Sequence, residues 1–290
     1  MGTQKIKFKL QGHEKFPLRE GWINKGLIAV SEKKNIFLDK EVPAPDELGI
    51  GNNMVKSLRY WLKAYGLIED NGAKGAELTP LGQMILNNDK YLERNFTLWC
   101  LHSEIVKNRE EATTWFLFFN HCDMQELTKD QIFQILRREL VQLIEGQKFS
   151  DKSLQNDMDV LLNMYSKASG GDDPEEKNVS PFAQLGLVKK TDGSYIKSHS
   201  DRRKISEWEI LYELAILMKD SDQISIEKAI ESENGIANIY QITNVQANEY
   251  FDRLDAMGYI HVNRTAGLDM IYRSKEFTRD DVMREYYQQH

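Results

Sequence analysis

Residues 46–65 carry the pattern that most constrains how this chain can fold. A short helix is expected to open there and to be broken by Gly49 and Gly51, because glycine is poor in helices and readily enters turns. A second helix should begin with Asn52 as its N-cap, whose side-chain oxygen can accept a hydrogen bond from a backbone N–H. Two helices joined by a glycine turn predict a helix-turn-helix. The second helix has an apolar stripe at helical spacing, made of Val55, Leu58, Leu62 and Tyr65.

The other side of that second helix is polar and cationic. It consists of Asn52, Asn53, Lys56, Arg59, Tyr60 and Lys63. No acid follows in the chain before Glu69, and asparagine amides can bond to adenine edges. A cationic second helix reached through a glycine turn has the geometry that enters a major groove. We therefore predict that these six residues contact double-stranded DNA. The alternative is an ordinary amphipathic helix with a solvated basic face.

The first of three expected domains is a winged helix-turn-helix over residues 1–90. A strand-like segment at 6–10 and a helix at 18–31 precede the helix-turn-helix. A β-hairpin wing should follow it. The closing helix should be capped by Thr79, with Pro80 at its first position. The fold class expected for the whole chain is therefore mainly α with small β-wings.

The second expected domain is a helical middle domain over residues 91–196. A polar, acidic loop is expected at 169–178, and a hairpin should turn at Asp192-Gly193. The helical patterns of this domain cover residues 97–106, 110–120, 128–144 and 153–165.

The third expected domain is winged-helix-like and covers residues 197–290. The stretch DRLDAMGYIHVNRTAG parallels YWLKAYGLIEDNGAKG of the first domain, since each reads as helix, glycine exit, apolar strand and glycine-containing turn. The helix face is less basic here, because Arg253 is surrounded by acids. An alternative is therefore that this domain packs against protein.

The overall charge limits how DNA could be bound. The formal net charge is −7 and the isoelectric point is near 5.5, whereas proteins that coat nucleic acid non-specifically are usually basic. Binding should then be local and salt-sensitive. The two cysteines cannot form a disulfide framework and lack CxxC spacing, which favours a reducing cytoplasm and argues against structural zinc. No apolar run reaches the roughly 18 residues of a membrane span.

Two groups of residues are candidates for catalysis. His13, Glu14 and Arg19, with Lys25 nearby, could hold a phosphate or a divalent ion, or could simply brace the first helix. Asp157 and Asp159 lie near a helix start, where acids are stabilised in any case. Magnesium-dependent nucleases need two or more such acids around the scissile phosphate. However, PD-(D/E)xK, HNH and GIY-YIG patterns are absent, as is a phosphate-binding P-loop. We assign no metal ligands from the sequence.

Several separated motifs resemble one bacterial family in the same order along nearly the whole chain. They are GHEKFPLREGWINKGL, GIGNNMVKSLRYWLKAYGLIE, ELTPLGQMIL, ATTWFLFFN and TAGLDMIYR. This family is catalogued as a domain of unknown function and includes SspB-like proteins of DNA phosphorothioation and anti-phage defence systems. The resemblance implies a cysteine desulfurase, a sulfurtransferase and an ATPase as partners. It also implies DNA nicking, which would open the backbone for sulfur insertion. No cofactor is certain from the sequence, but nicking at the candidate residues would use a divalent metal such as magnesium or manganese.

Three hypotheses remain open from the sequence. The chain is a DNA-binding component of a sulfur-modification system, with nicking activity as a further option. It is alternatively a transcriptional regulator without catalysis, or a scaffold for the sulfurtransferase and the ATPase. The acidic isoelectric point favours the scaffold over a DNA-coating protein.

Overall fold

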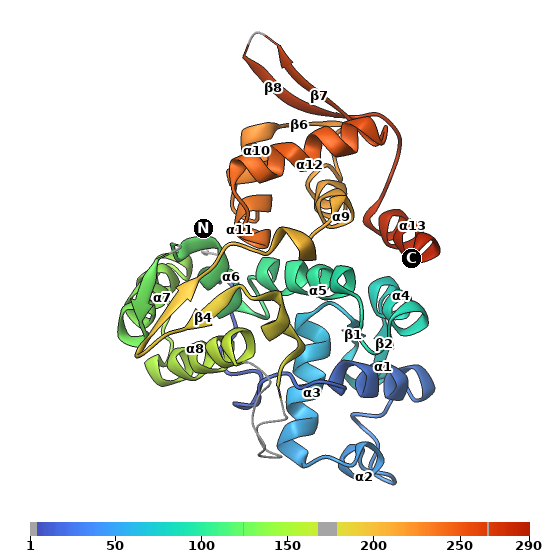
Figure 1. Cartoon of the computed structure of the whole chain (residues 1–290). Helices are drawn as coiled ribbons and strands as arrows, with labels where there is room; N and C mark the ends of the chain where they lie inside the picture. Colours follow the sequence, from blue (N-terminus) through green and yellow to red (C-terminus); the bar gives the residue numbers. More distant parts are fainter. Residues whose placement is uncertain (1–4, 124, 168–178, 266) are drawn as a thin grey trace. The chain divides into compact units, whose positions relative to one another are not determined.

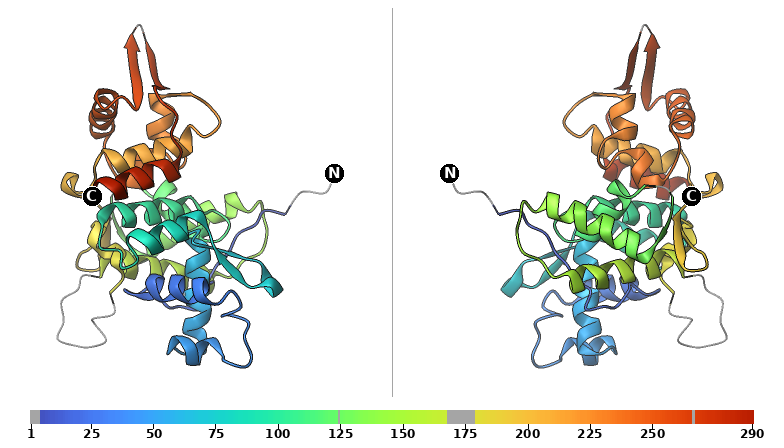
Figure 2. Two further views of the ribbon diagram at one scale, coloured as in Figure 1. Left: turned by 90° about the vertical axis from the view of Figure 1, so that its right-hand side faces the viewer. Right: turned by 90° about the vertical axis from the view of Figure 1, so that its left-hand side faces the viewer.

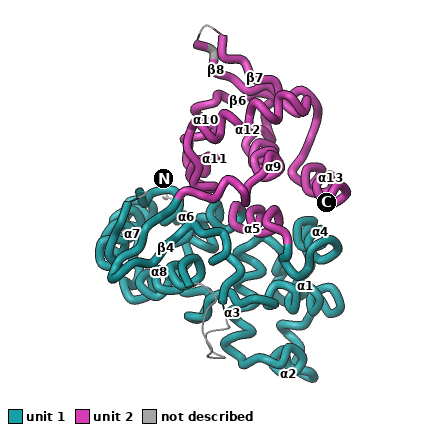
Figure 3. The backbone as a smooth tube through the Cα atoms, viewed as in Figure 1, with its two compact units in different colours: residues 1–93, 104–198 teal, residues 94–103, 199–290 magenta. Residues whose placement is uncertain are grey.

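The structure is a computed structural model that describes residues 5–123, 125–167, 179–265 and 267–290 (Figure 1). It is mainly helical, with three small antiparallel sheets among these residues. The acidic loop expected at 169–178 lies outside the described residues. The chain forms two compact units (Figure 3). They are residues 1–93 with 104–198, and residues 94–103 with 199–290.

The N-terminal part of the first unit follows the expected order of elements. Strands β1 and β2 pair in antiparallel fashion, and the backbone N–H of Ala76 also donates to the carbonyl of Lys34 at 2.7 Å. Thr79 caps helix α4 by accepting from the N–H of Gly82, and Pro80 is its first residue, as expected. The elements are α1 (Trp22–Glu32), α2 (Ala44–Leu48), α3 (Asn52–Ala64), β1 (Ile68–Asp70), β2 (Ala76–Leu78) and α4 (Pro80–Asn88).

Three local expectations in this part were wrong. Helix α1 begins at Trp22 instead of residue 18, because Gly21 in front of it takes a left-handed conformation with φ 77°. The N-cap of α3 is Gly51 and not Asn52, since no side chain caps that helix. Residues 6–10 are not a β-strand, because they pair with side chains of the middle region instead of with another strand.

The middle of the chain is less helical than expected. Its helices match the predicted ones to within a few residues, but strand β3 was missed and pairs with β5. The sheet order is β3-β5-β4, and the β4–β5 hairpin turns at Asp192-Gly193 as predicted. The elements are α5 (Asn95–Lys107), α6 (Thr113–His121), β3 (Glu126–Thr128), α7 (Lys129–Leu143), α8 (Asp151–Ser166), the short 3-10 helix η2 (Pro181–Leu185), β4 (Val188–Lys190) and β5 (Ser194–Lys197).

The last part of the chain has the same strand arrangement as the middle. Its sheet order is β6-β8-β7. Strands β7 and β8 form a hairpin, and β8 also pairs with the earlier strand β6. This β7–β8 hairpin extends beyond the helices of its unit (Figure 2). The elements are α9 (Glu207–Leu217), β6 (Gln223–Ser225), α10 (Ile226–Glu231), α11 (Ile236–Tyr240), α12 (Asn244–Ala256), β7 (Ile260–Thr265), β8 (Leu268–Arg273) and α13 (Arg279–Gln289).

Helix α5 contributes to both units. Residues 94–103 belong to the second unit, whereas the helix continues to Lys107 within the first. In the second unit, Phe96 stacks on Tyr286, and the indole of Trp99 donates to the carbonyl of Lys204 at 2.7 Å. Both Phe96 and Trp99 are fully buried, so this short stretch is part of the second unit's core.

Candidate nucleic-acid interface

The apolar stripe of helix α3 is a core element, as predicted. Leu58, Leu62 and Tyr65 are completely buried, and Val55 is nearly so. Helix α3 packs on α1 and α2 and precedes strand β1. This packing fixes which side of the helix faces solvent.

Only the first turn of the predicted DNA-reading side is open. Asn52, Asn53 and Lys56 are exposed. Tyr60, in contrast, is buried, and its hydroxyl donates to the carbonyl of Glu111 at 2.9 Å, so its assignment to the reading face was wrong. The bulk of the ring packs in the core.

The other two cations of this side are held by acids. Arg59 donates to both carboxylate oxygens of Asp70 on strand β1, from Nε at 2.8 Å and from Nη2 at 2.7 Å. Lys63 Nζ lies 3.4 Å from Glu111 Oε1. Arg59 and Lys63 were predicted to contact DNA. Each instead forms an ion pair with an acid of the same chain, so neither is free to bind a phosphate. The fork of Arg59 instead ties strand β1 to helix α3.

These contacts shift the titration of the acids. The hydrogen bonds from Arg59 hold the pKa of Asp70 below its usual value. Burial acts to raise the pKa of Glu111, but Lys9 and Lys63 outweigh burial and leave that pKa lowered. Both acids therefore stay ionised at neutral pH and keep their cations in place.

The two candidate catalytic groups meet in the interior. Nε2 of His13 lies 2.8 Å from Oδ1 of Asp157, and both side chains are buried. His13 Nδ1 accepts from the N–H of Lys15 at 3.1 Å, which places the ring hydrogen on Nε2 as the donor to Asp157. Asp157 also accepts from the N–H of Gln11 at 2.7 Å and from Thr114 Oγ1 at 2.9 Å.

Aromatic rings close this cluster off from solvent. The imidazole of His13 stacks on Trp61 with ring centroids 5.6 Å apart, and the rings of Tyr60 and Trp115 contact its edges. A buried polar group that has its hydrogen bonds satisfied stabilises one packing arrangement. The structure therefore places His13 and Asp157 in the core, where their contacts support packing, and their catalytic role stays a prediction.

The other candidate catalytic residues do not contact the buried His13–Asp157 pair. The guanidinium of Arg19 lies over the ring of Trp22 at 5.6 Å, and Lys25 donates to the carbonyl of Leu48 at 2.7 Å. Asp159 accepts from Lys129 at 2.7 Å on the surface, and Glu14 lies in a turn with φ 49°. In the described part of the chain, no three His, Cys, Asp or Glu side chains gather to hold a metal ion.

Lys197 is a buried cation that sequence reasoning missed. Its ammonium donates to the carbonyls of Phe118 and Phe119 at 3.2 Å and of Cys122 at 2.6 Å, at the C-terminal end of α6. Burial lowers the pKa of Lys197 to about 8. Since the free carbonyls at a helix end attract cations, this lysine caps α6. No local sequence signal marks it.

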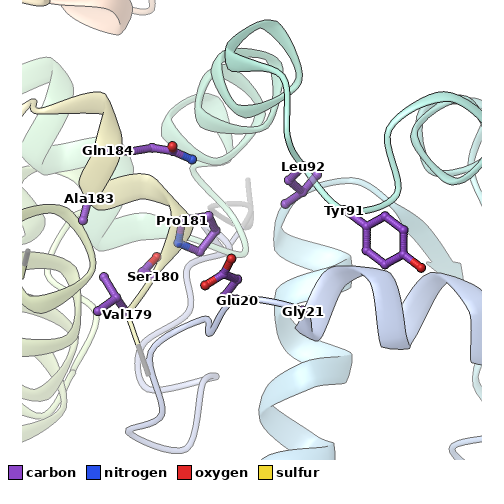
Figure 4. Close-up of a pocket in the computed structure, with 9 residues that line it drawn as sticks. All are labelled: Glu20, Gly21, Tyr91, Leu92, Val179, Ser180, Pro181, Ala183 and Gln184. Atoms are coloured by element: carbon purple, nitrogen blue, oxygen red, sulfur yellow. The ribbon is translucent and has the colours of Figure 1, made fainter. Parts of the chain in front are cut away.

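One hollow of about 350 Å³ in the first unit lies between the start of α1 and the residues around η2 (Figure 4). Among the described residues that line it, Glu20 carries the single charge, and Tyr91 lies at its rim. A hollow with one acid and no cation does not suit a phosphate-bearing ligand. We therefore place no nucleotide there.

A second hollow, of about 380 Å³, lies in the second unit between α10, α12 and β8. Its charged lining residues are all acids, namely Glu227, Glu231 and Asp269. Arg264 donates to Asn248 in this lining and is paired with Asp252. A hollow lined by acids does not attract a phosphate backbone.

Comparison with known proteins gives the family. The profile of a family described as "Protein of unknown function (DUF4007)" matches residues 10–287. The chain belongs to the DUF4007 family. This confirms the family expected from the separated motifs. No curated protein sequence matches the chain.

Two solved structures share the fold of this DUF4007 protein. One is described as "SspB crystal structure", with a TM-score of 0.84, and the other as "Magnesium ion-bound SspB crystal structure", with a TM-score of 0.85. Each is 22% identical and covers 97% of this chain and 88% of the SspB chain. At this identity the likeness establishes the fold. Among the described residues, no helix is both long and apolar enough to cross a membrane.

Because one of the SspB structures is described as magnesium-bound, we asked whether the candidate acids of this chain could hold a magnesium ion. A site for Mg²⁺ normally contains carboxylate or carbonyl oxygens in octahedral geometry. The acids predicted for this role, Asp157 and Asp159, do not gather, since one is buried against His13 and the other is paired with Lys129. The described residues therefore do not fit a magnesium centre at that place, and we derive no step through the metal.

Proposed function

We propose that this protein is the SspB-like component of a DNA phosphorothioation system and that it contacts double-stranded DNA through its first unit. The observation that carries the proposal is the exposed first turn of α3. Asn52, Asn53 and Lys56 form an amide-rich, cationic turn at the start of the second helix of a helix-turn-helix. The whole-chain likeness to SspB supports the phosphorothioation context.

The proposed contact is smaller than a full recognition helix. The N-terminal turn of α3 would reach base edges, while the β1–β2 hairpin would act as the wing of a winged helix. Arg59 would fix the angle between the two through its contact with Asp70. With one free lysine on the helix and a net charge of −7, affinity should depend on a few phosphates and fall steeply with salt.

Fluorescence anisotropy with a labelled duplex tests this interface. We expect Lys56→Gln to weaken binding and to reduce the slope of log K against log salt by about 0.9, the value for one lost phosphate contact. Lys152→Gln is the matched control, because Lys152 is exposed at the start of α8 and makes no described salt bridge. Equal effects of both variants would show that only net charge matters, and the groove assignment would then fail.

DNA nicking is a separate question, because no cluster of metal ligands supports it in the described residues. Supercoiled plasmid incubated with the protein and magnesium or manganese would measure it. Nicking that EDTA abolishes, and that persists in Asp159→Asn, would show a metal-dependent reaction that does not need Asp159. Footprinting without nicking would instead favour the transcriptional regulator.

The acidic hollow of the second unit supports a second candidate function, that of a scaffold. Three carboxylates without a lining cation favour a partner protein with a basic surface, such as the sulfurtransferase or the ATPase of the same system. Binding of each purified partner to the wild type and to Glu227→Lys with Asp269→Lys would measure it. We expect the double charge reversal to abolish partner binding while DNA binding is retained.

A further inference from the structure

We propose that the lysine-rich segment at residues 5–9, together with Arg109, forms a second contact for the DNA backbone, separate from helix α3. This inference rests on the proposed DNA binding and names a further surface for it. The segment reads Lys-Ile-Lys-Phe-Lys, so lysine alternates with an apolar residue. Figure 2 shows that it leaves the first unit on the same side as the β1–β2 hairpin.

The segment is held in place, although it belongs to no sheet. Three hydrogen bonds connect it and the residues that follow it to the middle region. They join Lys9 N to Thr113 Oγ1 at 3.0 Å, Gln147 Nε2 to the carbonyl of Ile6 at 3.0 Å, and Gln11 N to Asp157 Oδ1 at 2.7 Å. The last bond ends on the buried His13–Asp157 pair. That pair therefore anchors a surface segment, and the lysines are presented at fixed spacing.

This spacing suits a polynucleotide backbone. Exposure alternates over residues 5–8, as it does where alternate side chains point to the same side, which in extended chain are about 6.6 Å apart. Neighbouring phosphates along one DNA strand have a similar separation. Lys5 and Lys7 are exposed, whereas Ile6 and Phe8 are partly buried. The cations therefore form one solvent-facing row, and the apolar residues fix the row to the protein.

Two hollows include residues of this segment in their lining. One of about 580 Å³ includes Gln147 in its lining, and the other, of about 460 Å³, includes Arg109. Gln147 Oε1 is buried and lacks a hydrogen-bond partner among the described residues.

The acids near this row leave it positive overall. Lys7 lies 3.7 Å from Glu110, and both side chains are mostly exposed, so that pair is weak enough for a phosphate to replace it. Glu111 binds Lys9 at 2.8 Å and also Lys63 of helix α3. Glu111 thus connects the row to the proposed groove-reading helix, and one duplex could contact both.

The test compares two double variants of the full-length chain. Lys5→Gln with Lys7→Gln should lower the salt slope of duplex binding by about 1.8, or about 0.9 for each lost phosphate. Lys189→Gln with Lys190→Gln is the matched control, since both lysines are exposed on β4. We expect this control to bind like the wild type and both variants to melt like it.

The outcomes separate this inference from the proposed function. If the wild type binds and Lys56→Gln weakens it, but the Lys5/Lys7 variant has the wild-type slope, the second contact is wrong and the α3 interface stands. Equal losses in the Lys189/Lys190 variant would overturn the second contact too, because net charge would explain both. If the wild type does not bind duplex at low salt, the proposed function itself fails.

Discussion

Nε2 of His13 lies 2.8 Å from Oδ1 of Asp157, although the two residues are 144 positions apart. The contact joins the segment before α1 to helix α8 inside the first unit. Histidine beside a carboxylate is also a common catalytic arrangement. Here, however, both side chains are buried and their remaining hydrogen-bonding positions are taken by Lys15, Gln11 and Thr114. We therefore expect the His13–Asp157 pair to stabilise the folded state.

We predict that Asp157→Ala destabilises the protein by about 3–5 kcal/mol, because His13, Gln11 and Thr114 each lose their acceptor and a buried group left unpaired costs about 1–3 kcal/mol. Urea unfolding at pH 7 measures the change. Asp159→Ala is the control, because Asp159 pairs with Lys129 on the surface and should cost less than about 1 kcal/mol. An Asp157→Ala protein that is as stable as the wild type but loses a DNA-cleaving activity would contradict the structural role.

Arg59→Gln should destabilise the protein by about 1–2 kcal/mol at pH 7, because Asp70 loses a two-pronged, partly buried partner. The pKa of Asp70 is lowered in the folded state, so this contribution is present above about pH 4, the unfolded value. It disappears as the pH falls through the lowered folded pKa. Unfolding measured from pH 7 to pH 2.5 should therefore show the variant and the wild type converging.

Lys34→Gln is the matched control for that experiment. Lys34 pairs with Glu77 of strand β2, which belongs to the same hairpin as Asp70, but both side chains are more than half exposed. We expect a change below about 1 kcal/mol. A pH-independent deficit in Arg59→Gln would mean that its aliphatic packing, including the contact with Phe37, matters more than the ion pair.

Glu209 should make the second unit less stable as the pH rises. Burial raises its pKa to about 7, against about 4.3 in an unfolded chain. Between these values the folded state binds the extra proton, so stability falls as the pH rises through this window and stays low above it. In Glu209→Gln the amide oxygen can still accept from Ser206, and the melting temperature should depend less on pH between 5 and 8.

Glu227→Gln serves as the control, since Glu227 is exposed on α10 in the same unit and does not act on the titration of Glu209. It should keep the wild-type difference in melting temperature between pH 5 and pH 8. If Glu209→Gln also keeps it, another group causes the pH dependence of this unit.

Local signals in the sequence predicted most helices and hairpins. Thr79-Pro80 marks the start of α4, and Asp192-Gly193 marks the turn of the β4–β5 hairpin, because cap and turn chemistry depends on adjacent residues. Strand β3 could not be found in this way. It has three residues, and its partner β5 lies about 70 positions later in the chain.

The predicted site was less accurate than the fold. Helical spacing correctly placed Lys56 on a solvent side, but it could not show that Asp70 and Glu111 neutralise Arg59 and Lys63. Periodicity describes one face of one helix, whereas these acids come from strand β1 and from the loop before α6. The burial of Tyr60 has the same origin, because its partner Glu111 is 51 positions away.

Residues 94–103 lie in the sequence between two stretches of the first unit, yet they supply Phe96 and Trp99 to the core of the second. Dividing the chain once after residue 198 would therefore give two incomplete fragments. The first would keep an apolar stretch without the core that buries it, and the second would lack that stretch. Swapping halves between relatives at that point should likewise produce insoluble hybrids. Viable chimaeras would have to exchange this ten-residue stretch together with the C-terminal portion.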